Sequence, residues 1–198
     1  MGSFYVNVTV KGPAQSDVVA AINERAAYVS PSVAGCTLIL DEACESQLEA
    51  EIITFAAVLS YRLHCPTFTV LVHDDDILAY WLHRDGSLLD WYNSNPGAFA
   101  PPGVTLTGPV GGNASLLAST FGAVESSSLV AALQTSHGPG NYVIETHRHK
   151  DIAESLGLPS FSAGLGYGYL QRGDSPGVSR DDFVATPLAT ANNRWRGP

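Results

Sequence analysis

The chain has 198 residues, of which 45% are hydrophobic and 15% are charged, and its formal net charge at pH 7 is -9. This length and apolar content suffice for one domain with a sizeable core. The negative charge repels phosphate backbones, which argues against nucleic-acid binding, and it suits a basic protein partner. No apolar run is long enough to span a membrane, so no membrane association is expected.

The three cysteines, Cys36, Cys44 and Cys65, lack Cys-x-x-Cys spacing and are odd in number. This pattern is typical of reduced thiols, so we expect a cytoplasmic protein with three free thiols, none of them catalytic. The N-terminal segment alternates apolar and polar residues and lacks the continuous apolar run of a signal peptide.

The first third of the chain predicts the order strand, helix, strand, helix. Residues 4–10 alternate between apolar and polar side chains, which favours a strand. Apolar residues at helical spacing predict a helix over about residues 16–28, and Ser46 is a suitable cap for a second helix over residues 47–63. Residues 36–41 are almost continuously hydrophobic, which is typical of a central strand.

Residues 68–93 predict a meander of three antiparallel strands. Asp85 and Gly86 favour a two-residue hairpin turn, because both central positions of such a turn need positive φ. Counting outward from this turn gives the strand register and one buried face. The predicted buried face consists of Tyr80, Leu82, Leu89 and Trp91.

The opposite face of the same hairpin mixes aromatic and polar side chains. It is too polar for a core and too aromatic for a surface that meets only water, so we interpret it as a binding surface. Its predicted binding residues are Trp81, His83, Asp90 and Tyr92.

A loop rich in proline and glycine, residues 96–112, follows the meander. Loops of this length in a compact domain are either functional or mark an internal boundary. The remaining sequence predicts helices over residues 114–121, 127–134 and 146–156, with short strands over residues 142–145 and 161–170.

These elements predict a single α+β domain over residues 1–170, with the loop 96–112 as an alternative internal boundary and a C-terminal tail over residues 171–198. Its sheet is expected to be mainly antiparallel, with the three-strand meander at its centre and helices packed on one face. Apolar residues of the tail should anchor it on this chain or on a second copy in a homo-oligomer. These anchors are Phe183, Val184, Leu188 and Trp195.

The segment HDDDILAYWLHRDGSLLDWYNSNPGAF is followed by a Gly-Gly loop, by THRHKDIAESLGLP and by a stretch rich in glycine and tyrosine. This combination, which covers most of the chain, resembles a group of small uncharacterised bacterial proteins. The resemblance implies a bacterial intracellular protein and carries across no catalytic residue and no activity.

Two clusters have side chains suited to a divalent metal ion. Asp74 and Asp76 belong to a run of three aspartates between two strands, where the oxygens either hold a hard cation or complete a polar turn. His147 and His149 would share a face on a strand, as zinc ligands do, but they would diverge at the start of a helix.

The sequence contains no motif of the common enzyme classes, and it predicts no catalytic residue and no cofactor. We therefore favour a non-enzymatic acidic interaction protein, of the inhibitor, immunity or scaffold type, that binds a basic protein partner. The alternative is a metal-dependent hydrolase or small-ligand enzyme that uses Asp74, Asp76, His147 and His149.

Overall fold

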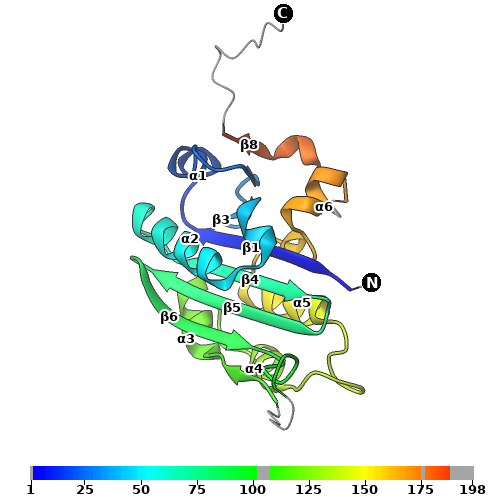
Figure 1. Cartoon of the computed structure of the whole chain (residues 1–198). Helices are drawn as coiled ribbons and strands as arrows, with labels where there is room; N and C mark the ends of the chain where they lie inside the picture. Colours follow the sequence, from blue (N-terminus) through cyan, green and yellow to red (C-terminus); the bar gives the residue numbers. More distant parts are fainter. Residues whose placement is uncertain (1, 102–107, 175–176, 188–198) are drawn as a thin grey trace, which may run out of the picture.

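A computed structural model of the chain describes residues 2–101, 108–174 and 177–187. Within these ranges the protein is built on one eight-stranded sheet with the order β7-β6-β5-β4-β1-β3-β2-β8 (Figure 1). All seven strand pairings are antiparallel, which confirms the α+β class with an antiparallel sheet. The strands are β1 (Phe4–Lys11), β2 (Ala27–Val29), β3 (Cys36–Asp41), β4 (Thr67–His73), β5 (Ile77–Arg84), β6 (Ser87–Asn93), β7 (Val110–Gly111) and β8 (Val184–Thr186).

Helices cover both faces of this sheet, which corrects the expectation that they pack on one face. In Figure 1, α2 crosses in front of the sheet and α5 lies behind it. The cause is visible in β1, where Val6 packs with α1 and α2 while its neighbour Tyr5 packs with α3, α4 and α5. Because residues 5–10 of β1 are buried on both faces, the strand needs cover on both sides. The helices are α1 (Gln15–Ala21), α2 (Glu49–Arg62), α3 (Ala114–Phe121), α4 (Ser127–Gln134), α5 (Glu145–Leu156) and α6 (Tyr167–Arg172), with short 3-10 turns η1 (Ala43–Ser46), η2 (Ser160–Ser162) and η3 (Arg180–Asp182).

The hairpin between β5 and β6 has the predicted turn. Asp85 and Gly86 have φ angles of 50° and 80°, as a two-residue turn with two left-handed positions requires. The register then shifts by one residue between Leu82 and His83, so that His83 pairs with Leu88 but Leu82 pairs with Asp90. This bulge inserts one unpaired residue into β6.

The bulge changes which residues of β6 are buried. Tyr80 and Leu82 are buried as predicted, whereas Leu89 is 40% exposed and Trp91 is 47% exposed. Trp91 pairs directly with Trp81, so the two indoles share a face, and Tyr92 takes the place opposite Tyr80 on the core side. The predicted burial of Leu89 and Trp91 was therefore wrong, because a register counted from the turn includes no bulge.

Three predicted elements take another form. The first helix ends at Ala21, and residues 27–29 form β2 instead of its last turn. In place of the predicted strand over residues 142–145, Tyr142 forms only an isolated bridge with His137, and Glu145 is the first residue of α5. The predicted strand over residues 161–170 is replaced by η2 and α6. In this last segment Gly166 lies so close to Tyr5 that an added Cβ would come within 2.6 Å of the Tyr5 Cβ atom.

The C-terminal part of the described chain packs onto the sheet. β8 pairs with β2, Phe183 is buried and Val184 packs against the core, so these two predicted anchors are confirmed. Leu188 and Trp195 lie outside the described residues. None of the helices in the described ranges is long and apolar enough to cross a membrane.

Candidate binding groove

A groove with a volume of about 540 Å³ lies on the α2 face of the sheet, over β4, β5 and β6. Its floor includes Trp81, which packs with the apolar side of α2, and Trp91, which lies opposite Trp81 on the same face. Leu71 and Ala79 continue the apolar floor. The groove exists because α2 packs mainly over β4 and β5, so that Trp91 on β6 remains 47% exposed on this face in the described part of the chain.

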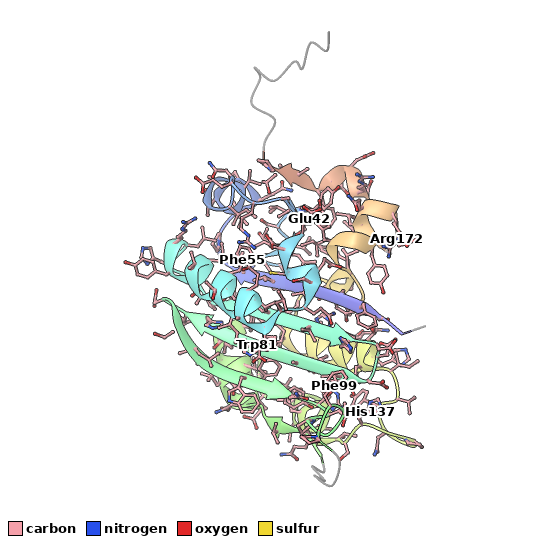
Figure 2. All side chains as sticks on the ribbon, in the orientation of Figure 1. Glu42, Phe55, Trp81, Phe99, His137 and Arg172 are labelled. Atoms are coloured by element: carbon pink, nitrogen blue, oxygen red, sulfur yellow. The ribbon has the colours of Figure 1, made fainter. Side chains whose placement is uncertain are left out.

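One end of the groove is closed by the segment that follows β6. Phe99, which is 73% exposed, packs edge-on against His73 with ring centroids 5.2 Å apart. Phe4 packs against the same imidazole at 4.4 Å. Figure 2 shows Trp81 and Phe99 on the same side of the sheet. The rings around this hollow are therefore buried Trp81, half-buried His73 and exposed Phe4, Trp91 and Phe99.

His73 is held in one orientation by Gln47. The Gln47 Nε2 group donates to the Val72 carbonyl at 2.9 Å, which leaves its Oε1 atom 2.6 Å from Nδ1 of His73. An amide oxygen only accepts, so the His73 Nδ1 atom carries the proton. When the ring is neutral, its Nε2 atom can accept a hydrogen bond. His73 therefore adds a hydrogen-bonding group to a groove wall that is mainly aromatic.

The charged residues that line the groove are acidic. Glu45 and Glu49 lie on its α2 side, and its lining includes neither lysine nor arginine. Burial raises the pKa of Glu45, although its carboxylate accepts a hydrogen bond from the Tyr167 amide at 2.7 Å. Glu49 is exposed in the first turn of α2. Aromatic faces beside carboxylates favour an apolar or a cationic side chain.

The four predicted binding residues separate in the structure. Trp81 lies in the groove and Tyr92 borders it, but the Tyr92 ring stacks on Tyr80 behind the sheet. The Asp90 carboxylate also lies behind the sheet and accepts from the Tyr80 hydroxyl at 2.7 Å and from the Asn113 amide at 2.8 Å. His83 is buried under α2, and burial lowers its pKa, so it is neutral.

The groove residues that the sequence did not indicate are Phe4, His73, Trp91 and Phe99. Trp91 was assigned to the core because the bulge was missed. Phe99 lies in a loop rich in proline and glycine, where few neighbours can bury an aromatic side chain. An aromatic residue in such a loop could therefore have indicated an exposed binding residue.

The run of three aspartates connects distant segments. Asp74 and Asp75 both have left-handed backbones, with φ angles of 52° and 58°. The Asp75 carboxylate accepts from the Ser3 amide at 2.8 Å and from the Thr146 hydroxyl at 2.8 Å, at the start of α5. Asp74 accepts from the Gly2 amide at 3.1 Å. These carboxylates hold the N-terminal segment and α5 in place.

The two histidines of the metal alternative point in different directions. His147 is exposed, whereas His149 is buried and its Nδ1 atom lies 2.9 Å from the Tyr5 hydroxyl. The structure therefore does not bring them together with Asp74 and Asp76. In the parts of the chain that the structure describes, no group of three or more His, Cys, Asp or Glu side chains is arranged to hold a metal ion.

A buried ion pair lies beside the aspartates. Glu145 and Arg148 are both fully buried, with the Arg148 Nε atom 2.6 Å from Oε2 of Glu145. Arg148 also donates to the Tyr92 hydroxyl at 3.1 Å and to backbone carbonyls, while His137 contacts the same carboxylate at 3.0 Å. Because every charged group has partners, this cluster fixes α5 against the sheet.

The three cysteines are free and buried, as predicted. Burial raises the pKa of Cys65 to about 11 and also raises those of Cys36 and Cys44. Thiols that remain protonated at neutral pH are poor nucleophiles.

Comparison of the chain with protein-family models, with curated proteins and with solved structures finds no match.

Proposed function

We propose that the protein is a non-enzymatic acidic interaction protein that binds a basic protein partner in the groove over β4, β5 and β6. The observation that carries this proposal is the combination of exposed Trp91 and Phe99 with a carboxylate rim that contains no lysine or arginine. Tryptophan and other aromatic side chains in a hollow are the usual anchors of protein recognition.

Charge supports a basic partner. The formal net charge of -9 attracts cations over a distance, and Glu49 offers a carboxylate beside the aromatic floor. An arginine or lysine side chain brings both a charge for the rim and an apolar stem for the rings. A cytoplasmic location is part of the same proposal, and the three free thiols support it.

The proposal is tested by selecting binders from a displayed library of random dodecapeptides. We expect the selected peptides to be enriched in arginine or lysine next to apolar or aromatic residues. Their affinity, measured by fluorescence anisotropy, should fall about tenfold or more in Trp91→Ala and Phe99→Ala, because each removes a principal contact surface.

Two matched controls separate the groove from general effects. Val124 is 86% exposed and lies outside the groove, so Val124→Ala should leave the affinity unchanged. Glu49→Gln should weaken binding, and more so at low salt, whereas Glu154→Gln on the exposed surface of α5 should not. Equal losses in groove and control variants, or selection of acidic peptides, would overturn the proposal.

A further inference from the structure

The outer edge of β6 is only partly paired in the described chain. β7 pairs with Tyr92 and Asn93, and residues 87–90 have no strand partner on that side among the described residues. The cause lies in Gly111 and Gly112, whose φ angles of 73° and 84° turn the chain away into α3. A Cβ atom on Gly111 would come within 2.1 Å of the Trp91 carbonyl oxygen. Glycine at this position therefore lets the chain pass close to β6 before it turns away.

The unpaired edge is apolar. Leu88 is 48% exposed and Leu89 is 40% exposed, next to the half-exposed Trp91. Bare sheet edges are commonly protected by lysine, by proline or by an inward-pointing charge. Neither lysine nor proline occurs in residues 87–93, and the one charge there, Asp90, is compatible with an added strand only if that strand brings a cation beside it.

The two sides of this edge differ in chemistry. Leu88 and Trp91 lie on the groove side, because they pair with His83 and Trp81. Asp90 lies on the other side, where its Oδ2 atom accepts from the Tyr80 hydroxyl, whereas Asp85 at the hairpin tip lies near His64 at the end of α2. An added strand alternates its side chains between the two sides, so apolar residues would meet the groove and a cationic residue would meet the Asp90 carboxylate.

We infer that the edge of β6 accepts an extended segment of the basic partner as an additional antiparallel strand, with apolar side chains toward Trp91 and a cationic side chain toward Asp90. This inference rests on the proposed function and specifies how the partner binds. A second copy of this chain fits the edge less well, because antiparallel pairing of two β6 strands about residue 90 would place the two Asp90 carboxylates opposite each other.

The test uses an acetylated and amidated octapeptide in which lysine alternates with valine or tryptophan. Its affinity is compared with that of the same peptide carrying N-methyl groups on alternate peptide bonds, which removes backbone donors. We expect N-methylation to weaken binding about tenfold or more, since two or three backbone hydrogen bonds are lost. Amide exchange measured by NMR should slow at residues 87–90 when the unmodified peptide binds.

Variants separate this inference from the proposed function. Leu89→Lys should abolish peptide-induced protection of residues 87–90, whereas Val124→Lys should not, and thermal melting checks that both are folded. If both peptides bind with equal affinity and both lose affinity in Trp91→Ala, binding in the groove is supported and strand addition is overturned. Peptide binding that does not depend on Trp91, or no binding at all, overturns both. Protection of residues 87–90 that appears without peptide as protein concentration rises identifies a second copy as the occupant and overturns the inference.

Discussion

At the scale of single residues, Asp75 stabilises three segments at once. Burial acts to raise its pKa, but hydrogen bonds from Ser3 and Thr146 outweigh this effect and lower the pKa below the ordinary value of 3.8. The folded state therefore favours the carboxylate. Its contribution to stability is present above the pKa of the unfolded chain and is lost as the pH falls through the lower pKa of the folded state.

We expect Asp75→Asn to lower the free energy of unfolding at pH 7 by about 1 kcal/mol, because charge-assisted hydrogen bonds at Ser3 and Thr146 are replaced by neutral ones. Asparagine tolerates the left-handed backbone at this position, so the loss is electrostatic. Urea unfolding measures the change. Asp74→Asn is the control, since Asp74 makes one exposed contact with Gly2, and an equal loss in both variants would contradict the assignment.

His149 controls stability in mild acid. Burial lowers its pKa to about 3, whereas an unfolded histidine titrates near pH 6.5. Between these values the unfolded chain binds a proton that the folded chain does not bind. Stability from this residue should therefore be complete above about pH 6.5 and should fall as the pH drops, by up to about 1.4 kcal/mol per pH unit. The lowered pKa of His83 acts in the same direction.

The variant His149→Gln isolates this effect. Glutamine keeps a polar group near the Tyr5 hydroxyl and does not titrate, so the urea midpoint of this variant should vary less between about pH 4 and pH 6.5 than that of the wild-type protein. An identical slope in the two proteins would show that His149 is not the group that takes up the proton. The comparison uses slopes because the substitution also changes packing.

At the scale of elements, the β5–β6 hairpin depends on the conformation of its turn. Gly86 has a φ angle of 80°, and space for a Cβ atom exists because the nearest atom, Cβ of Tyr61, would be 3.5 Å away. Gly86→Val should therefore destabilise the protein by about 1 kcal/mol or more through backbone strain alone. Gly86→Asn, which tolerates the left-handed region, should cost less, and equal thermal melting of the two variants would refute this cause.

The elements also show what the sequence determines locally. Alternation in β1, the Asp-Gly turn and the glycine stop of α5 at Gly157 were predictable, because each depends on neighbouring residues. The bulge at Leu82 was not, since it is selected by packing on both faces of the sheet. α6 was missed for a similar reason: Glu45, distant in sequence, accepts the hydrogen bond from Tyr167 at its first turn.

The candidate site was predictable only in part. Trp81 and the aromatic character of its face followed from the strand pattern, whereas the basic partner suggested by the acidic balance stays a prediction. His73 and Phe99 join the groove through tertiary contacts that no local pattern encodes. The run of three aspartates is the opposite case. Its sequence pattern suits a cation, but in the structure the Asp75 carboxylate accepts hydrogen bonds from Ser3 and Thr146.

At the scale of the whole molecule, β8 is the last strand at one edge of the sheet and covers the edge of β2. Its residues pair with β2, Phe183 is buried, and the Thr186 hydroxyl donates to the Arg25 carbonyl at 2.7 Å. Deletion of residues 183–198 should lower the melting temperature, because it removes this burial and exposes the edge of β2. It should also increase the apparent mass in light scattering, since bare edges associate.

A second truncation, which removes residues 188–198 only, keeps β8 and serves as the matched control. The difference in melting temperature between the two truncations measures the contribution of β8 and Phe183. Equal melting and equal mass for the full chain and the longer deletion would show that β8 adds nothing to the stability of the sheet.

The position of β1 in the middle of the sheet has a consequence for synthesis. β1 is translated before every other strand, yet one of its two neighbours is β4, whose residues leave the ribosome only after α1, β2, β3 and α2. Its residues, which are buried on both faces in the folded protein, must therefore wait for partners that are still to be made. The β4–β6 meander, by contrast, can pair as it emerges, since each strand follows its neighbour directly. We therefore expect a nascent chain halted before β4 to leave one edge of β1 unpaired and to be prone to aggregation.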